Sequence, residues 1–451
     1  MPVNVVILAA GQGTRMNSEL PKVLHPLAGA PLVVHAMRAG LALEPERLIV
    51  VTGAGGAGGE AVAGAARAYR PEAVIAIQAE PNGTGDAVLA AAGALEGAAG
   101  DLLVLYGDTP FVSGETLERM QAARADADIV VLGFESRPEE RYGRLVTDGD
   151  ELLEIVEWAD ADGATRALTL HNSGVVMADA AVLLRLLARV EPRNAQGELY
   201  LTDIVALGRA DGLRAAVVRC DEEETMGINT RAHLARAEEV FQARARAALM
   251  ADGVTLKSPG QVILAFDTAI GRDATVEGPC VFGPGVTVET GAHVLPFCHL
   301  EGCHISRGAS VGPFARLRPG AELDEDAHVG NFVEVKNARL GEGVKAGHLS
   351  YLGDAEIGPR TNIGAGTITA NYDGVFKHRT TVGRDAFIGS NTVLVAPVTV
   401  GDEAMTATGS TVTRDVPEGA MAIARARQEV KDGFARRFFA RLRARKAARK
   451  G

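Results

Sequence analysis

Two glycines, an arginine and a lysine follow closely on the first apolar run of this chain. The run VVILAA leads into a loop in which Gly11 and Gly13 precede Arg15, and Lys22 follows in LPKV. Backbone N–H groups of a glycine-rich loop can hold phosphate oxygens, and two cations can neutralise a leaving pyrophosphate. The spacing fits neither the P-loop nor the dinucleotide fingerprint, which needs Gly where Met16 stands. We therefore expect a triphosphate site of another class, with a plain strand–helix turn as the alternative.

Later segments supply further groups for such a site. Gln78 ends an apolar run, and its amide can recognise a base edge; Gly83 and Thr84 follow before a helical stretch. Asp108 ends the run LLVLYGD, which places it at the carboxyl edge of a sheet, where open α/β sheets bind ligands. A carboxylate at that edge suits Mg²⁺.

The apolar pattern predicts the elements that position these groups. Up to residue 229, the runs VVILAA, LIVVTG, AVIAIQ, DLLVLYGD, DIVVLGF and AAVVRC alternate with Ala- and Leu-rich stretches. This alternation is typical of an α/β, Rossmann-like domain with a mostly parallel sheet covered on both faces. Residues 230–251 contain neither Pro nor Gly and predict a helical linker. We therefore divide the chain into 1–229, 230–251 and 252–451.

The third region repeats every six residues. Its recurring side chains are aliphatic or aromatic, with Thr406 as the polar exception: Ile270, Val276, Phe282, Val288, Val294, Leu300, Ile305, Val311, Leu317, Leu323, Val329, Val335, Ile357, Ile363, Val382, Ile388, Leu394, Val400 and Val412. Three hexapeptides close a coil of roughly 18 residues, which predicts a left-handed parallel β-helix, and such prisms commonly pack as trimers. Residues 364–381 interrupt the repeat and predict a projecting loop.

Counting by coils brings two cations together. Arg318 and Lys336 lie one coil apart and each follows an inward position, so they should stack about 4.8 Å apart. Like charges this close repel unless an anion lies near them, which suggests a phosphate clamp; two solvated surface cations are the alternative. His348, beside a Tyr-containing turn, is a candidate general base.

Composition excludes several classes. The chain has 451 residues, is 47% hydrophobic and has a formal net charge of −11, which argues against a nucleic-acid binder. It has neither a signal-peptide pattern nor an apolar run of about 18 residues, so we expect a cytoplasmic protein without a membrane partner. Its four cysteines do not suggest disulfides. The motif CHLEGCH could indicate zinc, but no third histidine stands near Leu264, where such a site would need one.

The motifs together resemble a known family. The opening loop with its later Pro-Lys resembles the sugar-nucleotide pyrophosphorylases. YGRLV, IVEW, HNSG and MGINTR, and then RLRPGA, NFVEVKNA, GHLSYLGD, GAGTITANYDG and VAPVTVG, extend the resemblance over nearly the whole chain to the bacterial bifunctional N-acetylglucosamine-1-phosphate uridyltransferases, which are also glucosamine-1-phosphate N-acetyltransferases. The resemblance implies a cytoplasmic homotrimer that makes UDP-N-acetylglucosamine for peptidoglycan and lipopolysaccharide synthesis. Mg²⁺ would be its cofactor, and UTP and acetyl-CoA its co-substrates.

The resemblance also implies residues for each site. The nucleotide would contact Leu8, Ala9, Ala10, Gly11, Lys22, Gln78, Gly83, Thr84, Tyr106, Gly107 and Asp108. The sugar side of the product would contact Gly143, Glu157, Asn172 and Asn229. Arg15 and Lys22 would be catalytic, and Asp108 and Asn229 would bind Mg²⁺.

In the second half, the resemblance assigns His348 as the base of acetyl transfer. Glu334 would orient His348. The sugar phosphate would contact Arg318, Lys336, Tyr351 and Asn362, and acetyl-CoA would contact Ala365, Asn371, Tyr372, Ser390, Thr408 and Arg425. Thr408 departs from the small Ala that the family carries at this position, so a contact there would run through the backbone.

Other interpretations remain open at this point. The nucleotidyltransferase alone could be active, with the β-helix as a trimerisation scaffold; a non-catalytic sensor would require the loss of Arg15, Lys22 or Asp108, and all three are present. The basic tail, residues 431–451, is expected to be disordered and solvated, with support of CoA phosphates at a trimer edge as the functional alternative and nucleic-acid binding as a more remote one.

Overall fold

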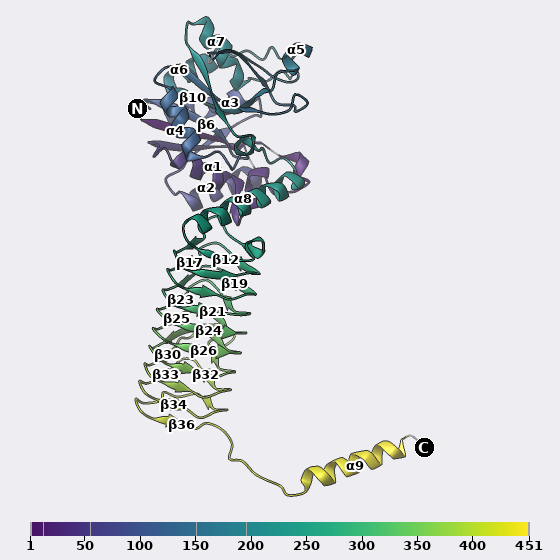
Figure 1. The fold of residues 1–451 in the computed structure, drawn as a ribbon, viewed down its shortest axis with the longest axis vertical. Coiled ribbons are helices and arrows are strands. Elements are labelled where there is room, and N and C mark those ends of the chain that lie inside the picture. Colours follow the sequence, from purple (N-terminus) through teal and green to yellow (C-terminus); the bar gives the residue numbers. More distant parts are fainter. Residues whose placement is uncertain (1, 12, 55, 150, 195, 450–451) are drawn as a thin grey trace. The chain divides into compact units, whose positions relative to one another are not determined.

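The computed structural model describes residues 2–11, 13–54, 56–149, 151–194 and 196–449, and Figure 1 shows the chain as a ribbon. The chain forms two compact units, Met1–Ala247 with Leu264–Phe266 and Ala248–Ile263 with Asp267–Gly451. The division falls inside helix α8, which runs from Arg231 to Ala251. Among the described residues, no helix combines the length and apolarity needed to span a membrane.

The first unit contains a nine-stranded sheet. Its order is β5 (Val74–Gln78), β4 (Arg47–Gly53), β1 (Val3–Leu8), β6 (Asp101–Tyr106), β10 (Leu170–Asp179), β7 (Ile129–Glu135), β11 (Ala215–Cys220), β9 (Glu151–Val156) and β8 (Arg144–Asp148). All six expected apolar runs are strands, and β5, β4, β1 and β6 pair in parallel. Strand β10 pairs antiparallel with β6 and β7. It was not expected, because the polar residues HNSG in its first half conceal its apolar second half.

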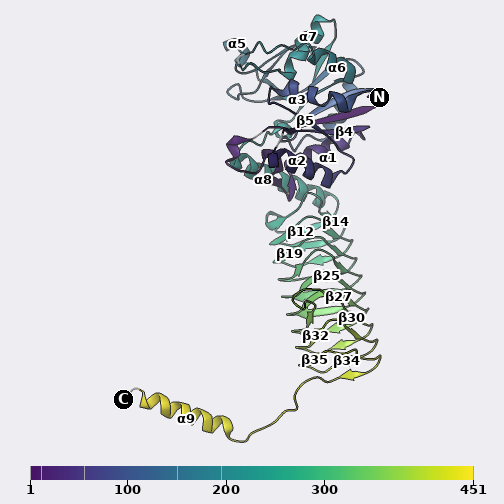
Figure 2. The same ribbon diagram turned by 180° about the vertical axis from the view of Figure 1, so that it is seen from behind.

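Helices cover both faces of this sheet, as Figures 1 and 2 show. Alternate residues of β1 serve two cores: Val6 packs with residues of α3 (Thr84–Ala90), α6 (Ala180–Leu187) and α7 (Ile204–Ala210). Ile7 packs with residues of α1 (Leu32–Leu41), α2 (Gly56–Tyr69) and α4 (Gly114–Ala123). The shorter elements are η1 (Thr14–Met16), η2 (Lys22–Leu24), β2 (Pro26–Leu27), β3 (Ala30–Pro31), η3 (Ala92–Leu95), α5 (Gly163–Arg166), η4 (Leu201–Asp203) and η5 (Glu222–Thr225).

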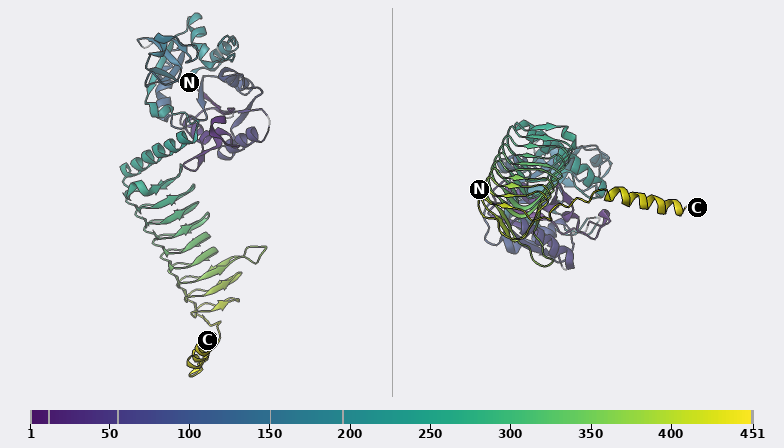
Figure 3. Two further views of the ribbon diagram at one scale, coloured as in Figure 1. Left: turned by 90° about the vertical axis from the view of Figure 1, so that its right-hand side faces the viewer. Right: turned by 90° about the horizontal axis from the view of Figure 1, so that it is seen from below.

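The second unit is a parallel β-helix, whose stacked coils are visible in Figure 3. One face consists of β12 (Thr255–Lys257), β15 (Thr275–Glu277), β18 (His293–Val294), β21 (Ser310–Val311), β24 (His328–Asn331), β26 (Lys345–His348), β28 (Asn362–Ile363), β31 (Phe387–Ile388), β34 (Met405–Thr406) and β36 (Met421–Ala422). The other strands are β13 (Val262–Ile263), β14 (Ala269–Ile270), β16 (Cys280–Phe282), β17 (Thr287–Val288), β19 (Cys298–Leu300), β20 (Cys303–Ile305), β22 (Arg316–Leu317), β23 (Ala321–Leu323), β25 (Glu334–Leu340), β27 (Tyr351–Ile357), β29 (Ile368–Ala370), β30 (Thr380–Val382), β32 (Val393–Val395), β33 (Val398–Val400) and β35 (Thr411–Val412), with the short helix η6 (Pro259–Gln261) beside them.

Every residue that the six-residue period placed inward is buried. The pairing of Val276 with Val294, and of Val294 with Val311, shows how these side chains stack from coil to coil. The polar exception is accommodated by hydrogen bonds, since Thr406 Oγ1 accepts from the Gly389 N–H at 3.0 Å and lies 3.1 Å from Thr392 Oγ1. A buried hydroxyl that finds such partners costs little stability.

Two expectations for the second unit need correction. The interruption is shorter than residues 364–381: β29 and β30 continue the coils, and only residues 371–379 leave the repeat. Figure 3 shows this inserted loop in yellow-green at one edge of the coils. The basic tail is helical rather than disordered from Phe434 to Ala448 (α9), because Ala and Arg favour a helix. Lys450 and Gly451, which the tail includes, lie outside the described residues.

Candidate active sites

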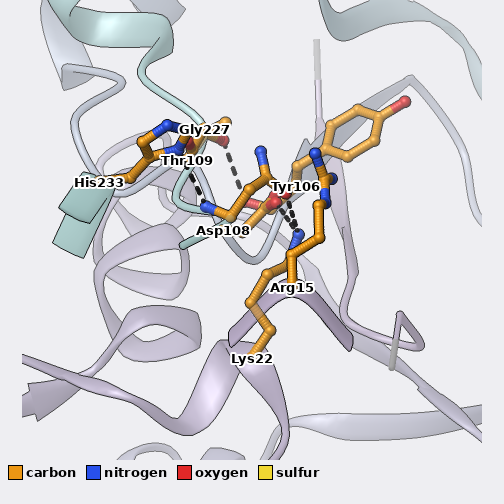
Figure 4. A network of polar contacts seen from close by, with 8 residues as sticks. Arg15, Lys22, Tyr106, Asp108, Thr109, Gly227 and His233 are labelled. Atoms are coloured by element: carbon orange, nitrogen blue, oxygen red, sulfur yellow. Dashed lines mark hydrogen bonds and ion pairs between the residues drawn. The ribbon is translucent and has the colours of Figure 1, made fainter. Parts of the chain in front are cut away.

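Four polar side chains of the first unit form one cluster, and Figure 4 labels three of them, Arg15, Lys22 and Asp108. The Lys22 ammonium forms an ion pair with the Asp108 carboxylate and donates to Asn229 Oδ1 at 3.0 Å. Arg15 Nη2 donates to the same amide oxygen at 2.9 Å. The structure therefore brings the two expected catalytic cations together with the two expected Mg²⁺ ligands.

Three segments deliver this cluster. Lys22 begins η2, Asp108 follows β6, and the segment before α8 is fixed by the Ile228 N–H, which donates to the Asp108 carbonyl at 3.0 Å. Gly13 has φ of +64°, and a Cβ added there would lie 2.3 Å from Lys22 Cβ. Glycine is thus required at this position for the loop to pack against Lys22.

A pocket of about 270 Å³ opens beside the cluster. Its lining includes nine of the residues expected at the nucleotide: Leu8, Ala10, Gly11, Lys22, Gln78, Gly83, Thr84, Tyr106 and Asp108. Ala9 and Gly107 do not line it, and Gly107 instead donates its N–H to the Leu8 carbonyl at 2.9 Å. Gln78 uses its amide nitrogen internally, donating to Gly83 O and to Asp86 Oδ2.

A second pocket of about 450 Å³ shares Thr84, Tyr106 and Glu198 with the first. Three residues expected at the sugar line it: Gly143, Glu157 and Asn172. The Asn172 N–H donates to the Gly143 carbonyl at 2.8 Å. Asn229, the fourth, lies in the Lys22 cluster instead. The two pockets are therefore continuous and suit a ligand with a charged part and a polar part.

Burial shifts two titratable groups at this junction. Desolvation raises the pKa of the Glu157 carboxyl, and the nearby Asp160 and Asp203 carboxylates raise it further. Burial also raises the pKa of the Tyr106 hydroxyl, with a smaller contribution from Glu157. Tyr106 is therefore a neutral hydroxyl throughout the neutral pH range.

Arg144, which the sequence analysis missed, organises the wall of the second pocket. It is fully buried, and its guanidinium donates to the carbonyls of Tyr142 and Pro138, at 2.5 and 2.7 Å, and of Glu140 at 2.8 Å. It also stacks 4.8 Å from the ring centroid of Trp158, which lines the pocket. The sequence held one sign of this role, because YGRLV places an Arg within a stretch that has the pattern of a strand. A buried Arg must find several hydrogen-bond acceptors.

In the second unit, Arg318 and Lys336 occupy neighbouring coils in register, and the Arg318 N–H donates to the Val335 carbonyl. The two cations are not equivalent, because Arg318 Nη1 lies 2.8 Å from Glu334 Oε1. Lys377 of the inserted loop lowers the pKa of Lys336, and Arg318 lowers it further. Lys377 therefore adds a third cation, which coil arithmetic could not find because the loop leaves the repeat.

The expected partner of His348 is wrong. Glu334 pairs with Arg318, whereas His348 Nδ1 lies 2.6 Å from Asn331 Oδ1, one coil away on the same face. An amide oxygen only accepts hydrogen bonds, so Nδ1 carries the proton and Nε2 has a free lone pair. The spacing in the sequence could have identified Asn331, since Asn331 and His348 are one coil apart and pair between β24 and β26.

Four residues expected at acetyl-CoA follow one another along the coils. The Ala365 carbonyl accepts from Asn391, the Ser390 carbonyl accepts from Gly409, which follows Thr408, and Arg425 approaches Gly409. The other two differ: Asn371 is buried and donates to Asp354, and Tyr372 is exposed on the inserted loop. Tyr351 pairs with Glu334, and Asn362 pairs with Lys345 on the His348 face.

Comparisons with known proteins match a family model to the first unit and full-length relatives to both units. The family described as "MobA-like NTP transferase domain" matches residues 5–197. A "Bifunctional protein GlmU" of Dinoroseobacter shibae is 65% identical over 450 residues, covering 100% of this chain and 99% of that protein. Proteins of the same name from Cereibacter sphaeroides and Paracoccus denitrificans are 62% identical over 448 residues and 60% identical over 445, with 99% of this chain covered in each case and 98% and 99% of those proteins.

The role of Arg144 predicts a local loss of order. Arg144→Leu leaves several buried carbonyls without a donor, so we expect the first unit to lose about 3 kcal/mol of unfolding free energy. Trp158 is the single tryptophan of the chain, and its fluorescence in Arg144→Leu should be quenched more readily by acrylamide.

The matched control is Arg166→Ala, because Arg166 stacks 5.0 Å from the same ring but is exposed. It should change the quenching less than Arg144→Leu does. Equal quenching in wild type and Arg144→Leu would show that Arg144 does not hold this wall.

Proposed function

The chain belongs to the family of bifunctional GlmU proteins, and we propose that each half carries one of the two transfers by which it makes UDP-N-acetylglucosamine. Residues 252–451 transfer an acetyl group from acetyl-CoA to glucosamine-1-phosphate. Residues 1–229 transfer a uridylyl group from UTP to N-acetylglucosamine-1-phosphate and release pyrophosphate, with 230–251 as the linker. The full-length likeness to bifunctional relatives favours two activities over a nucleotidyltransferase on an inert scaffold.

The Lys22 cluster is the observation that carries the uridylyl transfer. In-line attack of the sugar phosphate on the α-phosphorus of UTP needs positioning and charge neutralisation rather than a covalent intermediate. Arg15 and Lys22 neutralise the phosphates, and the amides of the Gly11 loop hold them. Because the Gln78 amide nitrogen already donates twice within the protein, its oxygen is the group left for the base. An amide oxygen accepts from the N3–H of uracil, and equally from that of thymine, so this contact supports a uridine or thymidine nucleotide.

The donor set at the cluster suits Mg²⁺. Asp108 and Asn229 both direct an oxygen at Lys22 Nζ, and Mg²⁺ is held by one or two protein oxygens together with waters and substrate phosphates. The described ranges contain no group of three His, Cys, Asp or Glu that could hold a metal. Asp108 and Asn229 would therefore hold the ion with the nucleotide, where it would neutralise charge on the leaving pyrophosphate.

The acetyl transfer uses His348 as its base. Asn331 fixes the tautomer, so Nε2 accepts the proton as the amine of glucosamine-1-phosphate attacks the thioester carbonyl of acetyl-CoA. The new C–N bond replaces the C–S bond, and the departing CoA thiolate takes up the proton from His348. Arg318, Lys336 and Lys377 hold the sugar phosphate, with Tyr351 and Asn362 at the sugar. The remaining residues contact acetyl-CoA: Ala365, Asn371, Tyr372, Ser390, Thr408 and Arg425.

An exposed aromatic ladder supports a homotrimer. Phe297, Phe314, Phe332 and Leu349 succeed one another at one corner of the coils and are all exposed. The Phe314 ring stacks on Phe297 at 4.6 Å and on Phe332 at 5.2 Å. Contiguous exposed apolar side chains mark interfaces. The ladder adjoins Asn331 and His348 in sequence, so a second copy would cover the corner beside the candidate base.

A cytoplasmic location follows from the co-substrates, which are cytoplasmic metabolites.

Asp108→Asn should reduce uridylyl transfer about a hundredfold or more, since it removes charge that preorganises the phosphate site. Acetyl transfer by the same variant should persist, which controls for folding. The matched control is Asp148→Asn on the exposed end of β8. UDP-sugar formation by Asp108→Asn close to the wild-type rate, in Mg²⁺, would refute this assignment.

Lys336→Ala removes a charge-assisted contact of roughly 1.5 to 3 kcal/mol, so kcat/KM for glucosamine-1-phosphate should fall by about tenfold to a hundredfold. Lys377→Ala should also lower kcat/KM for glucosamine-1-phosphate, whereas Lys345→Ala, at an exposed position, should leave it unchanged. The Kd of acetyl-CoA should hardly change. A Lys336→Ala enzyme with an unaltered glucosamine-1-phosphate dependence would mean that the stacked cations are ordinary surface charge.

Phe314→Glu should dissociate the trimer, because it places a carboxylate in the middle of the aromatic ladder. Light scattering should report a monomer for Phe314→Glu and a trimer for both the wild type and Ile77→Glu, an exposed position in the first unit. A trimeric Phe314→Glu would place the subunit contact elsewhere.

A further inference from the structure

Helix α9, Phe434–Ala448, combines dense positive charge with large apolar side chains. It contains six cations and no carboxylate in the sequence FARRFFARLRARKAA, and none of its residues is buried. Phe434, Phe438, Phe439 and Leu442 are all exposed. The Phe434 and Phe438 rings stack at 5.9 Å. An isolated helix in water gains nothing from exposing three phenylalanines, so this face is suited to a partner.

Three of the apolar side chains line one side of the helix, and the cations are spread around it. Phe434, Phe438 and Leu442 are four residues apart and so lie along one side. Arg436 and Arg443 are seven apart and lie along the opposite side. Arg441 and Arg445 are seven residues after Phe434 and Phe438 and so lie on the apolar side itself, where their long stems can bend toward water or phosphate. Large apolar side chains next to cations with long stems suit the boundary between an apolar phase and a layer of phosphates.

Charge complementarity identifies the occupant. The whole chain has 46 cations and 57 carboxylates; removing the six cations of α9 leaves 40 against 57, a net charge of −17. An anionic surface would therefore repel the rest of the chain and attract this helix. Nucleic acid supplies phosphates but no cover for the aromatic side. We propose that α9 docks on an anionic lipid surface, with its arginines at the headgroup phosphates and its phenylalanines in the acyl layer.

This mode of binding needs no spanning segment. Fifteen residues rise about 22 Å along a helix, which is shorter than the hydrocarbon core of about 30 Å. The expectation of no membrane partner was based on the absence of a long apolar run, and a surface helix does not require one. Docking by α9 would hold an otherwise acidic enzyme at the membrane without using any residue of the two candidate sites.

Flotation of the full-length protein with lipid vesicles tests the proposal. The wild type should float with vesicles enriched in phosphatidylglycerol and stay behind with phosphatidylcholine alone. The triple variant Arg436→Gln, Arg441→Gln, Arg443→Gln should partition about a hundredfold more weakly, since each cation near an anionic surface contributes about fivefold. The double variant Phe438→Ser, Leu442→Ser keeps every charge and should also lose binding. The matched control Arg436→Lys, Arg441→Lys, Arg443→Lys should bind as the wild type does.

Several outcomes would overturn the proposal. The wild type could fail to float with phosphatidylglycerol, or the double variant could float as well as the wild type, which would reduce the helix to a charge tag. Binding of a single-stranded RNA oligonucleotide without binding of vesicles would assign α9 to nucleic acid. A change in oligomeric mass in the double variant, without vesicle binding by the wild type, would assign it to contacts between copies. Both transferase activities, measured without vesicles, should be unchanged in all variants and so report correct folding.

Discussion

The contact of Lys22 with Asp108 and Asn229 joins three segments of the first unit that are far apart in sequence. The Lys22 and Asp108 side chains are only 14% and 16% exposed, so water screens their charges little and each must keep its partner. Strand β6, the loop after β1 and the segment before α8 are all held in the positions that this contact requires. The result is a set of cations and oxygens arranged before any phosphate arrives, which is the condition for electrostatic catalysis.

In the second unit, the repeat of the coils brings polar groups together in advance of a ligand. Parallel pairing with offsets close to one coil places side chains that are distant in sequence one strand spacing apart. That rule stacks Arg318 with Lys336 and sets Asn331 beside His348. It also lines up the aromatic ladder and the turns that carry the acetyl-CoA candidates. The inserted loop departs from the repeat and brings Lys377 toward the stacked cations.

Periodic features were predictable from the sequence, and features set by particular contacts were not. The six-residue period identified the inward residues, including Thr406, and the apolar runs identified six strands. Strand β10 escaped because polar residues occupy its first half. Arg144 and Asn331 escaped because their importance lies in their partners, which only the folded chain supplies. The partner of Glu334 was misjudged because Glu334 lies near two groups, and Arg318 offers it an opposite charge. Helix α9 was not predicted, because the dense positive charge of the tail was taken to outweigh the helix propensity of its Ala and Arg residues.

The most direct test of a two-reaction enzyme is product analysis on the purified full-length protein. Glucosamine-1-phosphate, acetyl-CoA, UTP and Mg²⁺ would be supplied together and then with each omitted in turn, and the sugar phosphates and nucleotides would be separated and quantified. We predict UDP-N-acetylglucosamine from the complete mixture, N-acetylglucosamine-1-phosphate without UTP, and no UDP-N-acetylglucosamine without acetyl-CoA. UDP-sugar formation from supplied N-acetylglucosamine-1-phosphate, with no acetylation of glucosamine-1-phosphate under any condition, would contradict the account and leave the β-helix as a scaffold.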